Sequence, residues 1–552
     1  MEIETKNCQN CKNEFTIESE DFRMYEKFDI PPSDLCPRCR WKYLLAFWAF
    51  GKFRVTKSAL SGKQIITVLP ESVSFPIYER EEFVSDAWDP LAYGKEYTPE
   101  QSFFEQFIAL QSKVPHPHNI GFGNTNCPWT DDWSYSKDCY LSRSGRYCEK
   151  ASYSYRVLNL KDTIDATYCF DLEKSYDCLY CFKGFKLHYS FNCHNCIESA
   201  FLYDCRNCSN CFLSWNLRNK QYYILNQPYS KEEYFKKLKE FDLNSYSGVQ
   251  KLKQEFNRIL QEEAVHRANL NIKTVNSQGN FLTECKNCYN CYFVDKSENM
   301  RHSIRVYEAK DSIDSVSCIS ESSAVGAVDQ EGYGNIGILY STKCRYSAYL
   351  DNCEESEYCF GSVGLRKKKY CILNNQYNEE KYKELVAQIK KDMKGRGEWG
   401  RFFPLTAAYS GYNLSLGQIL FPEIKANIIA MGGKWDEEVE QHYENTIQSS
   451  DLPDSIKDVS DSITSQRIIC PETGLSYNIA SHELEFYREH GIPLPRQHFD
   501  WRTKNRYKPM TLMLAPQRGT CIFCKKEHEH YYAPELGYKK VACVECYQQE
   551  IA

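Results

Sequence analysis

The segment 212–226, FLSWNLRNKQYYILN, recurs at 360–374 as FGSVGLRKKKYCILN, an offset of 148 residues. Upstream, KDTID at 161–165 matches KDSID at 310–314, an offset of 149. An internal repeat of this kind decides the fold class before any single motif does. The middle of the chain is therefore predicted to hold two copies of one unit, at 124–274 and 275–439, each ending in a helical tail.

A shorter repeat runs inside each copy. Polar turn residues followed by aromatic or β-branched residues recur every 10 to 13 positions, from Asp138 to Asn210 in the first copy and from Asn290 to Tyr358 in the second. Strands at this spacing predict either a β-solenoid or a meander sandwich. We favour a short parallel β-solenoid, because similar residues at a fixed step would stack.

Two further features of the repeats lead to predictions. Ser230 and Asn378 are predicted to cap the closing helices. Aspartates at the turns would hydrogen-bond their own turns; the alternative is a carboxylate face like that of sugar-cleaving solenoids. These aspartates are Asp138, Asp165, Asp177 and Asp204.

The chain contains 28 cysteines, and those of the middle region allow two interpretations. They can form a ladder of small buried side chains, a role that free cysteine fills well. They can also hold more metal, as zinc or an iron–sulfur cluster, although neither triple is followed by the x3-Cys-Pro of ferredoxins. The ladder is favoured because Cys208 aligns with Ser356 in the second copy. The additional metal ligands would be Cys205, Cys208, Cys211, Cys285, Cys288 and Cys291.

Both ends of the chain carry paired C-x2-C motifs. Two such turns supply the four thiolates of a tetrahedral zinc site, and the spacings match those of zinc ribbons. We therefore expect zinc as cofactor, at two sites. The predicted ligands are Cys8, Cys11, Cys36 and Cys39 at one end and Cys521, Cys524, Cys543 and Cys546 at the other.

The first 45 residues resemble the zinc-ribbon family of treble-clef type. The resemblance rests on Cys8, Cys11, Phe15, Ile17, Tyr25, Pro31, Cys36, Pro37, Cys39 and Arg40. It implies a zinc-holding module. As a whole, the chain resembles bacterial multi-zinc-ribbon, cysteine-rich repeat proteins, a resemblance that brings no activity with it.

A degenerate copy of the same module follows near 470–508. An offset of 462 places Cys8 on Cys470 and Arg40 on Arg502 without a gap. The other three cysteines fall on Thr473, His498 and Trp501, so only Cys470 and His498 remain as ligands, too few for a tetrahedral shell. We expect a treble clef held by aromatic side chains instead of zinc, namely Tyr477, Phe486, Tyr487 and Trp501.

These observations predict a multidomain chain, mainly β with helices. Duplicated β-solenoid-like (or meander) repeats would be flanked by small zinc-ribbon or treble-clef modules. A helix capped at Thr98 is expected in the connector. Around the two repeat units we predict a zinc ribbon at 1–57, an α+β connector at 58–123, an acidic, Ser-rich linker at 440–466, a metal-free treble clef at 467–510 and a second zinc ribbon at 511–552.

Bulk composition limits the partners. The net charge of −6 and the pI near 6.1 give no global attraction to nucleic acid or anionic membranes. The N-terminus lacks a signal-like apolar stretch, and the longest apolar run, 44–50, is too short to cross a bilayer. We expect a cytoplasmic protein with reduced thiols and no membrane partner. The sequence leaves its oligomeric state open.

The leading functional hypothesis is a zinc-binding scaffold that binds nucleic acid, with RNA favoured over DNA. Cations interleaved with aromatic residues suit phosphates and unstacked bases. The acidic pI argues against a dedicated nucleic-acid binder, so a protein-interaction scaffold with structural zinc is the alternative. The predicted nucleic-acid-binding residues are Arg38, Arg40, Lys42, Arg502, Lys504, Arg506 and Lys508.

An enzyme is the third hypothesis. The sequence has no P-loop, no G-x-S-x-G and no H-E-x-x-H motif, and no nucleophile–base pair stands out. No catalytic residue is predicted. An iron–sulfur or carbohydrate-acting enzyme on a β-solenoid is the form that this hypothesis would take.

Overall fold

The computed structural model describes residues 3–437 and 446–552. The chain mixes strands and helices and forms several sheets. It divides into two compact units that interleave in the sequence. Unit 1 comprises Met1–Asn119 and Asn269–Glu437, and unit 2 comprises Ile120–Ala268 and Glu438–Ala552. Each unit contains one copy of the duplicated region. Unit 1 also contains the N-terminal module, and unit 2 contains the modules predicted at 467–510 and 511–552. The finer domain boundaries expected from the sequence stay predictions.

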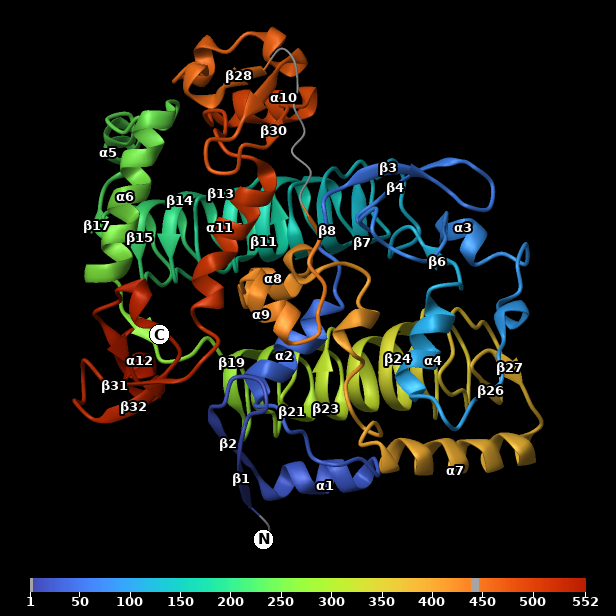
Figure 1. Ribbon diagram of the computed structural model, residues 1–552. Helices are drawn as coiled ribbons and strands as arrows, with labels where there is room; N and C mark the ends of the chain where they lie inside the picture. Colours follow the sequence, from blue (N-terminus) through green and yellow to red (C-terminus); the bar gives the residue numbers. More distant parts are fainter. Residues whose placement is uncertain (1–2, 438–445) are drawn as a thin grey trace. The chain divides into compact units, whose positions relative to one another are not determined.

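The first copy, in unit 2, is a parallel ladder of strands (Figure 1). Tyr155 lies beside both Arg143 and Thr167, twelve residues away on either side. Because the pairing is parallel, the meander alternative is wrong for this region: meander strands are antiparallel. The strands of this first ladder are β7 (Thr130–Ser134), β8 (Ser142–Arg146), β9 (Glu149–Ser152), β10 (Tyr155–Leu158), β11 (Lys161–Glu173), β12 (Tyr176–Leu179), β13 (Phe182–His188), β14 (Ile197–Tyr203), β15 (Ser209–Trp215) and β16 (Gln221–Ile224), with the short β17 (Gln227–Pro228) antiparallel at the end.

Within each twelve-residue step of the ladder, the backbone conformation repeats every three residues. Every third residue from Tyr135 to Leu225 has a positive φ. Asn and Asp tolerate this left-handed conformation better than other side chains that carry a Cβ. This explains the polar turn residues seen in the sequence, among them Asp138, Asp165 and Asp177.

The residue after each left-handed position is typically small and buried. Cys169, Cys181, Cys193 and Cys205 form one such column at twelve-residue steps. The Cys181 thiol donates a hydrogen bond to the Leu179 carbonyl, two residues back (3.3 Å). Buried serines make the same bond, so thiol and hydroxyl are interchangeable fillers of one interior. Three-residue cysteine spacing in the middle of the chain therefore follows from this backbone period.

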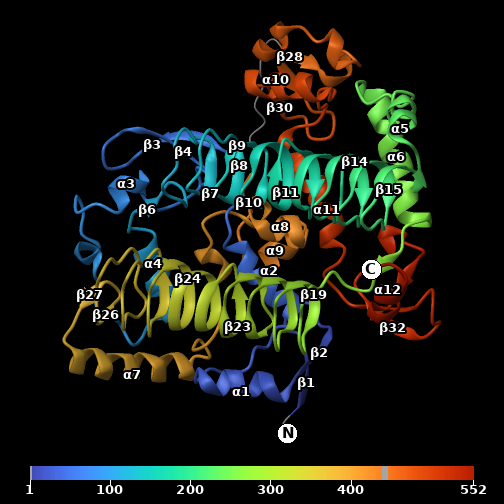
Figure 2. The same ribbon diagram turned by 180° about the vertical axis from the view of Figure 1, so that it is seen from behind.

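The second copy, in unit 1, is also a parallel ladder (Figure 2). Some of its steps are eleven residues long instead of twelve. Ile336 pairs with Ala348, twelve residues on, but Ile313 pairs with Ala324, only eleven on. This missing residue accounts for the change of offset between the copies from 149 to 148. The second ladder contains β19 (Gln278–Thr283), β20 (Tyr289–Asp295), β21 (Glu298–Arg301), β22 (Ile304–Tyr307), β23 (Lys310–Val316), β24 (Ile319–Thr342) and β25 (Ala348–Asp351), and ends in the antiparallel pair β26 (Cys371–Ile372) and β27 (Asn375–Gln376).

Helices close each ladder as predicted. The Ser230 hydroxyl accepts from the Glu233 amide at the start of α5 (Lys231–Leu238), and Asn378 caps α7 (Glu379–Gly395) in the same way. In unit 2 a second helix, α6 (Tyr246–Glu262), follows α5. The cap predicted for the connector helix is wrong: α4 (Phe103–Gln111) begins at Ser102, whose hydroxyl accepts from Glu105, while the Thr98 amide bonds the Gln106 side chain.

The predicted linker is largely packed. Residues 440–445 lie outside the described residues. After them, β28 (Thr446–Gln448) pairs with β29 (Arg467–Ile469), and Leu452, Ile456 and Ile463 are buried in a hydrophobic cluster of unit 2. The Ser-rich composition reflects short 3₁₀ turns capped by Ser455 and Ser460. Among the helices of the described residues, none combines the length and apolar character needed to cross a membrane.

Candidate metal centres and the contacts around them

Four cysteines converge at the N-terminal module. Cys8 and Cys11 lie in the turn between β1 (Glu4–Asn7) and β2 (Glu14–Ile17), and Cys36 caps α2 (Pro37–Ala46), which carries Cys39 in its first turn. The four sulfurs lie within 4.8 Å of one another. The hairpin turn and the helix start thus place four thiols around one point.

Hydrogen bonds within the tetrad favour a thiolate at Cys36, and the bond that Cys36 shares with Cys39 raises the pKa of Cys39. The Cys36 amide donates to the Cys8 sulfur (3.3 Å), and the Asn10 side chain donates to the Cys39 sulfur (3.3 Å). Bonds from the Cys39 thiol and amide lower the pKa of Cys36 to about 5, against the effect of burial. A thiolate at the N-terminus of a helix is further favoured by the helix dipole.

The donor set fits zinc. Zn–S bonds of about 2.3 Å in a tetrahedron place neighbouring sulfurs about 3.8 Å apart, and the Cys11 and Cys36 sulfurs lie 3.6 Å apart. Four cysteines fill the shell and leave no position open for water, which is the pattern of a structural rather than a catalytic site. Cys8, Cys11, Cys36 and Cys39 would therefore hold the ion.

The C-terminal module repeats this geometry. Cys521 and Cys524 lie between β31 (Gln517–Thr520) and β32 (Glu527–His530), and Cys543 caps α12 (Val544–Glu550), which includes Cys546. The Cys543 amide donates to the Cys521 sulfur (3.4 Å), as Cys36 does to Cys8. Although burial raises the pKa of Cys521, amides of Cys543 and Cys524 lower it to about 6. This second tetrad also meets the distance condition for a metal.

The degenerate module has the same backbone without the tetrad. In the N-terminal hairpin Lys6 pairs with Phe15, and at the 462-residue offset Ile468 pairs with Tyr477, linking β29 to β30 (Ser476–Tyr477). The helices α1 (Ser19–Lys27) and α10 (Ser481–His490) begin at the same offset, as do α2 and α11 (Phe499–Thr511). The Cys470 thiol bonds the Glu472 carboxylate, and His498 caps α11. Tyr477, Phe486 and Tyr487 are buried in the hydrophobic cluster, as predicted. Trp501, the fourth aromatic residue of that prediction, is only half-buried and is not part of the cluster.

The residue after the fourth ligand position contacts a ladder aspartate in all three modules. Arg40 follows Cys39 and pairs with Asp314 in unit 1 (3.1 Å). In unit 2 Arg502, which follows Trp501, pairs with Asp165 (3.0 Å), and Tyr547, which follows Cys546, donates its hydroxyl to Asp204. All three aspartates have positive φ. Each module is thus fixed to a ladder by the residue next to its metal corner.

These contacts correct part of the predicted nucleic-acid surface. Arg40, Arg502 and Arg506 were predicted to bind nucleic acid, but all three are buried in ion pairs with aspartates. Lys42 pairs with Glu423 and is half-buried. Exposed positions remain at Arg38, Lys504 and Lys508.

The six middle cysteines proposed as extra ligands are buried within the two ladders. Cys205 and Cys208 donate to carbonyls two residues back, and Cys285 does the same. Within the described residues, only the two terminal tetrads bring three or more ligand atoms together. The geometry therefore fits the thiol-ladder interpretation, and extra metal at these positions stays a prediction for metal analysis.

Sequence reasoning missed the role of Asp165 and Asp314. Both partners of the arginine–aspartate contacts belong to sequence repeats. Arg40 and Arg502 are related by an offset of 462, and Asp165 and Asp314 by an offset of 149. Pairing the two sets of repeats would have predicted which module packs on which ladder. It also missed Lys253 of α6, which pairs with Asp177 (2.6 Å) and for which no motif gives a signal.

No protein-family model matches the chain, and no curated protein matches it in sequence. The site is therefore interpreted from its own geometry.

Proposed function

We propose that the protein is a non-catalytic binding scaffold in which zinc at the two terminal tetrads is structural. The observation that carries the proposal is the triple contact of Arg40, Arg502 and Tyr547 with ladder aspartates. A closed four-cysteine shell next to a buried contact stabilises a module rather than presenting a reactive metal. In this proposal both ladders are β-solenoids of about twelve residues per coil, and all three modules are treble clefs.

Protein partners are favoured over RNA. Burial of three arginines removes much of the basic surface that phosphate contacts need. The second ladder instead exposes a column of stacked tyrosines: Tyr333, Tyr346 and Tyr358 are 39%, 49% and 37% exposed. The Tyr346 and Tyr358 rings stack at 5.1 Å. Exposed tyrosine is enriched at protein interfaces, because it adds contact area at a low entropic cost.

Salt-dependent binding separates the two partner classes. We expect no saturable binding of a fluorescent single-stranded RNA by the full chain at about 50 mM or at about 200 mM salt, because burial of Arg40, Arg502 and Arg506 leaves few cations for phosphate contacts. Binding through phosphates would instead weaken steeply between these two concentrations. Saturable, salt-sensitive binding that is lost in a Lys504→Glu, Lys508→Glu variant would restore RNA as the ligand. An Arg38→Glu variant is the matched control from the other predicted patch.

A further inference from the structure

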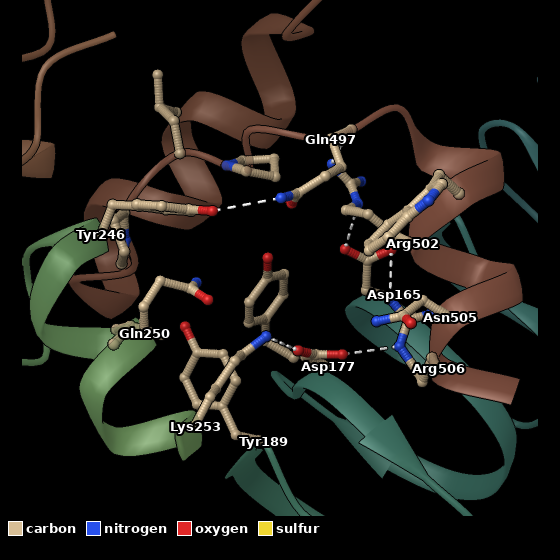
Figure 3. A pocket seen from close by; sticks show the side chains of 16 residues that line it. Asp165, Asp177, Tyr189, Tyr246, Gln250, Lys253, Gln497, Arg502, Asn505 and Arg506 are labelled. Atoms are coloured by element: carbon tan, nitrogen blue, oxygen red, sulfur yellow. Dashed lines mark hydrogen bonds and ion pairs between the residues drawn. The ribbon is translucent and has the colours of Figure 1, made fainter. Parts of the chain in front are cut away.

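Unit 2 contains a cavity of about 100 Å³ beside the metal-free module (Figure 3). Its lining comes from three places: the first ladder, helix α6, and the segment that leads into and through α11. Trp501, which occupies the position of Cys39, is one of the lining residues. The cavity therefore lies next to the position in the metal-free module that corresponds to the metal ligand Cys39 of the N-terminal module.

Two charged residues of the cavity have apolar counterparts in unit 1. The 462-residue offset places Arg506 of the cavity on Leu44. Ladder pairing places Asp177, one step after Asp165, on Val325, one step after Asp314. Leu44 and Val325 are both buried. Arg506 and Asp177 therefore have no charged counterpart in unit 1, whereas Arg502 and Asp165 correspond to the pair Arg40 and Asp314.

An alternating chain of charges forms one wall of the cavity (Figure 3). Arg502 pairs with Asp165 (3.0 Å), and Asp165 pairs with Arg506 (2.9 Å). Arg506 also pairs with Asp177 (2.8 Å), and Asp177 pairs with Lys253 (2.6 Å). The chain thus contains three cations and two anions, and both of its ends are cations. The network has one positive charge in excess, and its Lys253 end is 41% exposed, so an anion that enters the cavity can pair with it.

Hydrogen-bond donors are also in excess. The Nη2 group of Arg502 is buried and has no hydrogen-bond partner. Burial raises the pKa of Tyr176 and of Tyr189 well above its usual value, so both phenols keep the proton that they can donate. Gln250 adds an amide. The carboxylates that could accept these protons are already engaged in ion pairs, so the lining suits a ligand rich in acceptors.

We propose that this cavity binds a small molecule carrying an oxyanion, a carboxylate or a phosphate, with Lys253 and Arg502 as the cationic contacts. The tyrosine rings would take the apolar or planar part of the ligand. The volume limits the ligand to a small metabolite-sized group rather than a polymer. The inference is independent of the scaffold function, since neither zinc nor a macromolecular partner takes part in it.

Calorimetric titration of the full chain with inorganic phosphate, and separately with benzoate, tests this proposal. We expect one saturable site per chain for at least one of the two probes, and the tighter one assigns the head group. Lys253→Gln should weaken that binding at least tenfold. Lys251→Gln, an exposed lysine on the same helix, should change it less than twofold.

If Lys253→Gln unfolds, Tyr189→Phe provides the test instead, because it removes only a hydroxyl. We expect Tyr189→Phe to weaken binding severalfold. Circular dichroism establishes that each variant is folded. Absence of saturable binding for both probes would overturn the proposal. An equal loss in the Lys251 and Lys253 variants would also overturn it, because it would indicate non-specific attraction to surface charge.

Discussion

The N-terminal module and the module at 467–510 share one backbone but differ in what holds it together. Strand register, helix starts and the arginine that contacts a ladder aspartate coincide at a single offset. One module brings four thiols together, whereas the other retains Cys470 and packs Tyr477, Phe486 and Tyr487 into a hydrophobic cluster. The fold of this module therefore does not require metal once enough apolar surface is buried. Contact with the ladder is the feature that both modules keep.

The largest expected effect separates the two modules by their dependence on metal. Cys36→Ser should remove one zinc per chain and unfold the N-terminal module, because the site loses a ligand and metal binding supplies folding free energy. Cys470→Ser, the matched change in the metal-free module, should leave the zinc count unchanged. Metal content and limited proteolysis measure both results. Zinc lost from the Cys470 variant would contradict the comparison.

The next effect concerns the shared contact. Arg40→Met should destabilise unit 1 by about 3–5 kcal/mol, because it leaves the buried Asp314 without its cation. Arg502→Met should destabilise unit 2 by less, because Arg506 still pairs with Asp165. Arg38→Met, on an exposed side chain of the same helix as Arg40, should cost less than about 0.5 kcal/mol. Hydrogen exchange in α2 and α11 reports each unit separately. If Arg40→Met behaves like Arg38→Met, the contact is not a stabilising one.

Asp21 and Glu483 occupy the same position in the two modules, but their pKa values are shifted in opposite directions. Burial raises the pKa of Glu483 to about 7, from an ordinary 4.5. The folded state therefore keeps a proton that the unfolded chain releases. Its contribution to stability is full below pH 4.5 and falls by about 3 kcal/mol as the pH rises through 7. Glu483→Gln should remove this slope from the pH dependence of unit 2 unfolding.

Asp21 provides the contrast at the 462-residue offset. Although burial raises its pKa, His302 and Arg301 lower it to well below the usual 3.8. Its stabilising contribution is therefore present above pH 3.8 and is lost as the pH falls through the lowered value. Asp21→Asn should weaken unit 1 at neutral pH, whereas Glu483→Gln should remove the loss of unit 2 stability between pH 4.5 and 7. Equal pH profiles for the two variants would refute this difference.

The smallest effect is expected within the ladders. Cys193 is a buried thiol that donates to the Phe191 carbonyl (3.4 Å). Cys193→Ser keeps a donor of similar size and should change the free energy of unfolding by about 1 kcal/mol, without changing the metal count. Cys521→Ser is the matched cysteine from a tetrad and should remove one zinc. A loss of metal from the Cys193 variant would show that the ladder thiols bind it.

The sequence predicted what depends on local spacing. The two tetrads, the helix caps at Ser230 and Asn378 and the metal-free copy at 467–510 follow from short motifs and a fixed offset. The burial of Arg40, Arg502 and Arg506 was not visible in the sequence, because it depends on aspartates hundreds of residues away. The three-residue backbone period was visible in the cysteines, but zinc knuckles have the same spacing.

The most direct test of the account is the number of metal ions bound by the purified, reduced full-length chain and by a variant with both Cys36 and Cys521 changed to serine. The account predicts two zinc ions per chain, each with four sulfur ligands, and none in the double variant. Iron, four or more zinc ions, or metal retained by the double variant would contradict it, because the ladder cysteines would then be metal ligands rather than a hydrogen-bonded interior.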